Sequence, residues 1–333
     1  MTYARSEIVE KGTVGVYHCV SRCVRRAFLC GNDKLSGKSF EHRREWIRGR
    51  LSLLVDLFAV EVIAYAAMSN HLHSVIKVRP DRASNWSDKE VAQRWRTLFP
   101  FRRTDDGYPE EPNKVEIDAI VGQKKLVALY RERLSDVSWF NRCLNENIAK
   151  RANREDECKG RFWEGRFKCQ RIFDVAGIIA CSAYVDLNPV RAGIAKTPEQ
   201  SDHTSIQDRI VERTGKSSAR HKNWSKVPLV PIAEATENCL SLDEYLKLVD
   251  ETGRLIIQGK KNISRSIGPI LERLNINESE WVSRTEYFRN SFRRVVGPEE
   301  CFQHAAKRAK KCWFHGVSAA RKLFQRIPNV STA

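Results

Sequence analysis

The spacing of apolar residues divides the first part of the chain into regular elements. Residues 15–22 are rich in β-branched and aromatic side chains and predict a strand. In 39–57, apolar residues recur three and four positions apart, which predicts an amphipathic helix. Two further apolar runs, 60–68 and 72–78, are separated by Ser69-Asn70 and predict a hairpin.

After the hairpin the pattern predicts an interruption and then three more elements. Residues 79–136 are polar and hold four prolines, so we expect an insertion with short helices of its own. Residues 139–154 predict a basic helix and 161–173 a strand. Residues 175–187 predict a helix that follows an N-capping aspartate and ends before a proline.

From about residue 198 the pattern changes to a long polar, helical region. We therefore expect one unit over 1–196, with the insertion at 79–136, and a mainly helical basic extension over 197–333. Near its end, 301–326 holds seven Lys and Arg residues and no acid. This segment predicts either a contact with duplex DNA or a solvated helical face.

The net charge of the chain limits the classes of partner that it is expected to bind. The 333 residues include 58 Lys and Arg and 41 Asp and Glu, a net charge of +17, which is typical of proteins that face phosphate, in nucleic acid or at an anionic membrane. No apolar run is long enough for a membrane span, and residues 1–11 are charged, so we expect no membrane association and a cytoplasmic location. Ten cysteines then predict reduced, mostly buried thiols; Cys19, Cys23 and Cys30 are the nearest candidates for a structural metal, although their spacing matches no zinc motif.

Two histidines stand next to each other on one predicted strand. Because side chains alternate along a strand, His71 and His73 share a face, with Leu72 on the opposite one. Adjacent imidazoles can bind one divalent ion. A structural role for both histidines is the alternative.

A tyrosine and an asparagine stand one helical turn apart. Tyr184 and Asn188 share a helix face, and Gly177, Ala180 and Cys181 precede them on it, so small side chains would leave room at the tyrosine. The alternative is a buried tyrosine followed by a helix-ending Asn-Pro.

Basic and aromatic residues interleave in 160–168, as they do where bases stack and phosphates are neutralised. An exposed strand with cation–π packing would look the same.

Four separated motifs, at 17–22, 67–73, 162–167 and 184–193, occur in the order found in a known family. Together they closely resemble the single-tyrosine HUH transposases, in particular the REP-associated tyrosine transposase branch. The resemblance covers about 12–80 and 138–196. The insertion is longer than the compact family pattern, and residues after about 200 match nothing in it.

The resemblance implies an α+β fold, with a ferredoxin-like antiparallel sheet and packed helices (the HUH endonuclease fold). It implies that His71, His73 and Asn188 bind Mg²⁺ or Mn²⁺ and that Tyr184 is the nucleophile. The implied activity is a DNA strand transferase or nickase that cleaves and rejoins single-stranded DNA at hairpins through a covalent 5′-phosphotyrosine. It also implies a bacterial, nucleoid-associated protein that works as a monomer or homodimer. The expected DNA contacts are Arg22, Arg25, Arg26, Arg161, Trp163, Arg166, Lys168 and Arg191.

Two other functions stay open at this stage. One is a non-catalytic DNA- or RNA-binding regulator that retains the fold. The other is a metal-dependent hydrolase of RNA or nucleotides, with water as the nucleophile. A covalent protein–DNA adduct separates the transposase from both.

Overall fold

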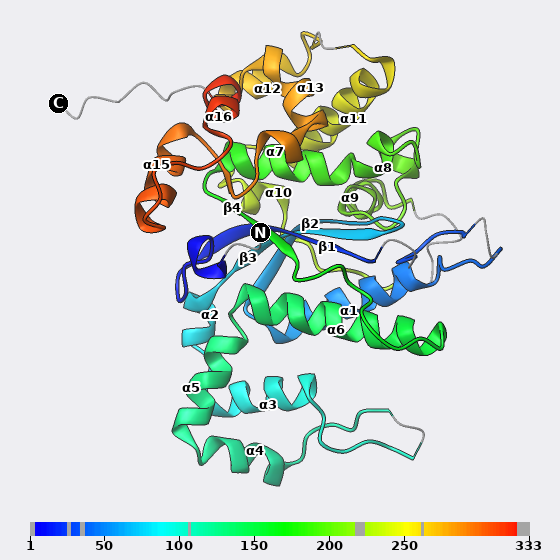
Figure 1. The fold of residues 1–333 in the computed structure, drawn as a ribbon, viewed down its shortest axis with the longest axis vertical. Coiled ribbons are helices and arrows are strands. Elements are labelled where there is room, and N and C mark those ends of the chain that lie inside the picture. The colour runs from blue at the N-terminus through cyan, green and yellow to red at the C-terminus, as the bar shows by residue number, and fades with distance from the viewer. Residues whose placement is uncertain are drawn as a thin grey trace.

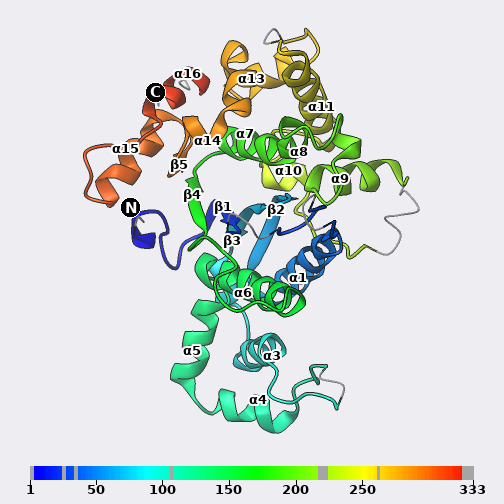
Figure 2. The ribbon, with the colours of Figure 1, turned by 45° about the vertical axis from the view of Figure 1, so that its right-hand side comes forward.

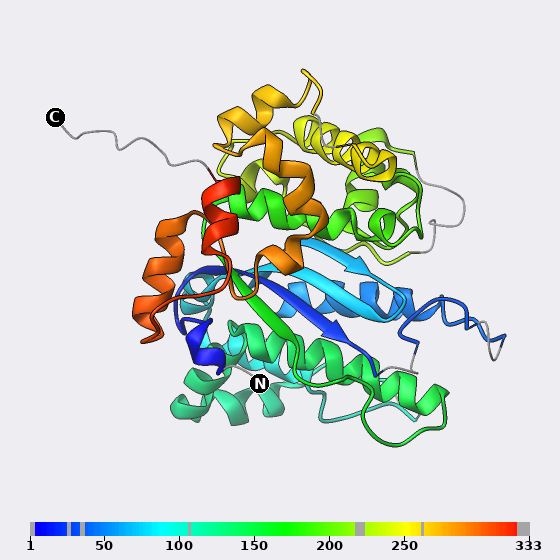
Figure 3. The ribbon, with the colours of Figure 1, turned by 45° about the horizontal axis from the view of Figure 1, so that its top comes forward.

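A mixed five-stranded sheet separates two layers of helices (Figures 1 and 3). This computed structural model describes residues 4–24, 28–33, 37–105, 108–216, 224–260 and 263–324. In spatial order the strands are β2 (Val60–Ala67), β3 (His71–Val78), β1 (Gly15–Arg22), β4 (Lys168–Ile172) and β5 (Val295–Val296).

The first four strands have the connectivity of a ferredoxin-like unit. Along the chain they run β1-α1-β2-β3-α6-β4 and pair antiparallel, with β1 and β3 at the centre. The fifth strand departs from the expected antiparallel sheet, because β5 comes from the C-terminal extension and pairs parallel with β4. The fold is therefore α+β with a mixed sheet.

One face of the sheet is covered by α1 (Arg43–Leu57) and α6 (Val137–Glu155), whose apolar sides share a core with residues such as Tyr17 and Ile76. The predicted insertion supplies four helices that attach to the outside of this layer (Figure 1). These are α2 (Pro80–Ser84), α3 (Asp88–Leu98), α4 (Lys114–Val121) and α5 (Lys124–Arg133).

The other face is covered by α7 (Val175–Asp186), and the extension packs over α7 in turn (Figure 2). The short helices η1 (Arg5–Glu7) and η2 (Pro198–Gln200) flank these layers. The remaining helices are α8 (Asn188–Arg191), α9 (Ser205–Thr214), α10 (Ile232–Ala235), α11 (Leu242–Gln258), α12 (Gly268–Arg273), α13 (Glu278–Glu286), α14 (Phe288–Ser291), α15 (Glu299–Arg308) and α16 (Val317–Leu323). Among the described residues, no helix combines the length and apolar character that a membrane span needs.

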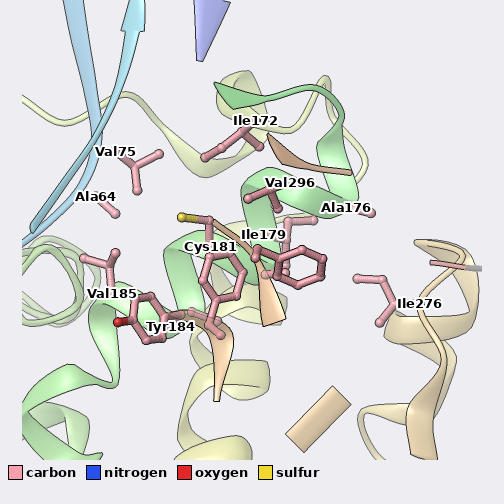
Figure 4. Close-up of a cluster of buried hydrophobic side chains, with 14 of the residues drawn as sticks. Ala64, Val75, Ile172, Ala176, Ile179, Cys181, Tyr184, Val185, Ile276 and Val296 are labelled. Carbon is pink, nitrogen blue, oxygen red and sulfur yellow. The ribbon is translucent and has the colours of Figure 1, made fainter. Parts of the chain in front are cut away.

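Small residues on α7 admit the sheet and the extension rather than a ligand. A Cβ at Gly177 would lie 3.1 Å from Ile172 Cγ2 and 3.4 Å from Val296 Cγ1. Cys181 is fully buried in the same cluster, which Figure 4 shows around α7. The space expected beside Tyr184 is thus filled by core side chains on this part of the helix.

One local prediction differs from the structure. Of the predicted strand 161–173, only Lys168–Ile172 forms a regular strand. Trp163 makes an isolated antiparallel bridge with Cys23, and its indole donates to the Asn145 carbonyl of α6 (2.8 Å). The predicted helix 175–187 is confirmed: α7 ends at Asp186, before Pro189, which lies in the first turn of the separate short helix α8, where a missing N–H costs nothing.

The C-terminal end of α7 is joined to the extension by a buried carboxylate. Asp186 is fully buried and accepts hydrogen bonds from the Ile206 amide (2.9 Å), the Tyr245 hydroxyl (2.5 Å) and the Ser205 hydroxyl. Burial raises the pKa of Asp186 to about 6, although the three donors oppose the shift. The group links α7 to α9 and α11.

We predict that Asp186→Ala lowers the free energy of unfolding by about 3 kcal/mol, because it leaves buried donors on Ile206 and Tyr245 without an acceptor. Urea unfolding measures the change. Asp250→Ala is the control: it removes a surface ion pair with Arg254 and should cost about 0.5 kcal/mol or less. Equal losses in the two variants would contradict a linking role for Asp186.

Candidate functional site

Four polar side chains form a row on the sheet face that carries α7. Gln170 of β4 lies opposite His18 of β1, and His18 is a diagonal neighbour of His73 on β3, because Val20 is the direct partner of His73. His71, two residues before His73, continues the row on the same face. The strand spacing thus brings His71 and His73 together, as predicted, and the strand order adds His18 and Gln170.

Hydrogen bonds fix the tautomer of each ring in this row. The Gln170 amide Nε2 donates to the Phe292 carbonyl (2.6 Å), so its Oε1 accepts from His18 Nδ1 (2.5 Å). With the His18 proton on Nδ1, Nε2 accepts from His73 Nδ1 (2.8 Å). The chain of donors therefore leaves a lone pair on His73 Nε2.

That lone pair is unused within the described residues. His73 Nε2 is buried and has no hydrogen-bond partner there. His71 Nδ1 lies 2.6 Å from the Asn70 Oδ1 acceptor, so its Nε2 also keeps a lone pair. The two ring centroids are 4.8 Å apart. Two neighbouring imidazoles with free lone pairs are a donor set for one divalent cation.

The protein environment keeps these rings neutral. Burial lowers the pKa of His18 to about 4 and, together with the nearby Arg22, Arg289 and Arg191 cations, lowers the pKa of His71 to about 4. Burial and the neighbouring rings also hold the pKa of His73 well below its ordinary value. At neutral pH no proton competes for the ring nitrogens.

Tyr184 projects from α7 onto this row. Its ring centroid lies 5.6 Å from that of His73 and 5.9 Å from that of His18, each edge to face. Phe288 of α14 stacks on the ring at 4.8 Å, and the Arg191 guanidinium lies 4.7 Å from its centroid. The ring is held on several sides, and the residue lines a cavity shared with the histidines.

The cavity has a volume of about 740 Å³ and a strongly positive lining. His18, His71, His73 and Tyr184 line it together with seven basic side chains and a single carboxylate, Glu164. The basic residues are Arg5, Arg22, Arg166, Lys168, Arg289, Arg293 and Arg294. Such a surface suits a polyanion.

The other expected site residues are distributed as follows. Arg22, Arg166 and Lys168 line the cavity, whereas Arg161 and Trp163 do not. Asn188 is buried beside Tyr184 and donates its amide to the Tyr184 carbonyl (3.3 Å), and Arg191 contacts the Tyr184 ring. Arg25 and Arg26 lie outside the described residues.

The basic segment near the C-terminus is only partly available to a ligand. Arg308 donates to the Glu7 carbonyl, and Arg321 pairs with Glu299. Phe314 is buried, while Trp313 is 70% exposed. Arg326 lies outside the described residues.

Sequence reasoning missed two residues of the polar row, His18 and Gln170, and four of the cavity cations, Arg5, Arg289, Arg293 and Arg294. His18 and Gln170 carry no local signal, because strand order alone makes them neighbours of His73. Arg289 and Arg293 had a detectable signal: a Phe-Arg pair recurs four residues apart, at 288–289 and 292–293. That spacing indicates aromatic anchors, each followed by a cation.

No family model and no curated protein matches the chain. A solved structure of a REP-associated tyrosine transposase bound to a REP hairpin aligns over 66% of this chain and 89% of that one, at 13% identity and a TM-score of 0.37. A TM-score and a sequence identity this low carry no argument about the function of this chain.

We predict an acid-sensitive stability that originates in the histidine row. The folded-state pKa of His18, about 4, lies below the ordinary 6.5, so its stabilising contribution is complete above pH 6.5 and is lost as pH falls toward 4. The total loss from this group is about 3 kcal/mol. Urea unfolding in EDTA, measured from pH 7.5 to 4.5, gives the free energy of unfolding at each pH. This free energy should fall less for His18→Gln than for the unaltered protein. Parallel curves of the free energy against pH for the two proteins would refute the assignment to His18.

Proposed function

We propose that the chain is a metal-dependent DNA strand transferase, a single-tyrosine transposase or nickase. It cleaves and rejoins single-stranded DNA through a covalent 5′-phosphotyrosine. The observation that supports this function most directly is the position of the Tyr184 ring beside His73, in a cavity lined by seven cations. Nucleophile, metal-binding nitrogens and a polyanion surface then share one space.

The residues present fit a divalent cation, Mg²⁺ or Mn²⁺. His71 and His73 would hold it through their Nε2 atoms, one of which is a buried atom with no partner among the described residues. Asn188 is proposed as the third ligand, through its amide oxygen, since its bond to Tyr184 uses only the nitrogen. No three His, Cys, Asp or Glu side chains gather into a metal site within the described ranges, so the remaining ligands would be water and phosphate oxygens. When bound, the cation withdraws charge from a phosphate oxygen.

The chain's own residues would carry the covalent step. The Tyr184 phenol oxygen attacks phosphorus, the tyrosyl O–P bond forms, and the P–O3′ bond breaks, so that the phenol proton is ultimately balanced on the 3′-hydroxyl. The Arg191 cation near the ring stabilises negative charge that develops on the phenol. Attack by a 3′-hydroxyl on the phosphotyrosine reverses the step and rejoins a strand.

From the motif resemblance we also propose that the cleavage sites lie at hairpins. The protein would work in the bacterial cytoplasm as a monomer or a homodimer. Arg22, Arg166 and Lys168 would contact the strand inside the cavity. Arg161 and Trp163 would lie outside it, on the approach to the site.

Tyr184→Phe should abolish both cleavage and the SDS-resistant protein–DNA band, while single-strand binding changes less than about threefold, because only the attacking oxygen is lost. Tyr287→Phe, on a tyrosine that is 53% exposed, is the matched control and should keep both activities. An adduct formed by the Tyr184→Phe protein would exclude Tyr184 as the nucleophile. Strand binding without cleavage by the unaltered protein would favour the non-catalytic regulator, and cleavage without an adduct would favour a hydrolase.

His73→Ala or His71→Ala should lower Mn²⁺ affinity by at least about tenfold and abolish cleavage, since each removes one ligand. Titration calorimetry measures the affinity, and an EDTA arm measures the metal requirement. His304→Ala, on an exposed histidine away from the row, is the control. Full cleavage in EDTA would overturn the metal role.

A further inference from the structure

The segment Phe288–Val296 fixes part of the C-terminal extension directly against the candidate site. Phe288 stacks on Tyr184, and the Phe292 carbonyl accepts from Gln170 (2.6 Å). The chain then pairs with β4, where the Arg171 amide donates to the Arg294 carbonyl (2.7 Å). This segment is therefore held at both the tyrosine and the sheet edge.

Each buried aromatic in the segment is followed by an exposed arginine. Phe288 and Phe292 are fully buried, and the next residues, Arg289 and Arg293, are exposed and line the cavity. The two anchors determine where the guanidinium groups can reach. Neither arginine has an ion-pair partner among the described residues, whereas the adjacent Arg294 pairs with Glu7 (2.8 Å).

Arg289 is close enough to act electrostatically on the whole site. Its charge contributes to the lowered pKa values of His18, His71, His73 and Lys168. For Lys168, burial is the largest cause and the Arg289 cation comes next. Mutual repulsion of this kind is relieved by an anion between the cations.

We propose that Arg289 and Arg293 form a phosphate-binding arm of the C-terminal extension, which holds the backbone of a single DNA strand across the cavity from Arg22 and Lys168. The inference rests on the proposed function and specifies how its substrate is held. The extension thereby supplies part of the strand-binding site, and the first 196 residues alone do not complete it.

The lining favours a single strand over a duplex. The arm and the sheet residues line one cavity that also has Phe167 and Tyr184 in its walls. A strand with unstacked bases can place its phosphates on the cations and a base near these rings. The cations are arginine and lysine without base-specific partners, which predicts contacts to phosphate and little sequence preference.

The test compares strand binding by Arg289→Gln/Arg293→Gln with that of the unaltered arm, in full-length protein that also carries Tyr184→Phe to prevent cleavage. Fluorescence anisotropy with a labelled, unstructured oligothymidine measures affinity from about 0.05 to 0.3 M salt. Two lost phosphate contacts should flatten the slope of log affinity against log salt by about 1.4, which corresponds to about 25-fold weaker binding at 0.1 M salt.

Two control variants separate lost contacts from changed folding and from general charge loss. Arg289→Lys/Arg293→Lys keeps both charges and should retain most of the slope. Arg265→Gln removes one exposed cation of the extension that does not line the cavity, and should leave slope and affinity unchanged. Thermal unfolding midpoints of all variants should agree within about 2 °C.

An unchanged slope and affinity in the double Gln variant would overturn the arm. The adduct assay on protein that retains Tyr184 tests the proposed function separately. An adduct together with an unchanged salt slope would support the strand transferase and contradict the phosphate-binding arm. If the wild-type protein binds strands through the arm but forms no adduct, the proposed strand-transferase function is wrong and the arm is retained. No strand binding at any salt concentration would overturn both.

Discussion

The geometry of the site depends on one chain of hydrogen bonds, from the Phe292 carbonyl through Gln170 and His18 to His73. Every link has a defined direction, because a side-chain amide nitrogen can only donate and a backbone carbonyl can only accept. The direction established at Phe292 determines which nitrogen of His73 is free. A break at any link would leave a buried polar group without a partner, at a cost of about 1–3 kcal/mol. Phe292, a residue of the C-terminal extension, thus determines that the free lone pair of His73, on the central strand β3, lies on Nε2.

The second constraint is the apolar character of α7. A helix that is hydrophobic all round is stable only when both sides are covered, and here the sheet covers one side and the extension the other. Tyr184 can therefore lie against the histidines and still be stacked by Phe288 from the opposite layer. The extension is not an appendage in this respect: it shares the core cluster of the first unit and adds β5 to its sheet.

Local patterns predicted the parts of the site that lie close together in sequence. Alternation placed His71 and His73 on one face, and helical spacing placed Tyr184 and Asn188 one turn apart. His18 and Gln170 could not be found in this way, since their contact spans 152 residues and depends on β1 lying between β3 and β4. The strand predicted over 161–173 is interrupted, because five positions separate Trp163 from Lys168 while three separate their partners Cys23 and Val20. The division of the chain near residue 196 stays a prediction, as do the metal and the roles of the site residues.

The charges that line the cavity favour the binding of an anion. Seven cations line the cavity, and only Arg22 and Arg294 among them lie within 4 Å of a described carboxylate, Glu164 and Glu7 respectively. The remaining cations repel each other, and the neighbouring imidazoles are kept neutral. A phosphodiester backbone removes that repulsion when it binds. In the proposed reaction, the phosphate would gain negative charge during attack by Tyr184, and the same cations would interact more strongly with that greater charge. Under the proposed function, the cavity cations would therefore stabilise the transition state more than the bound strand, which is the condition for catalysis rather than for binding alone.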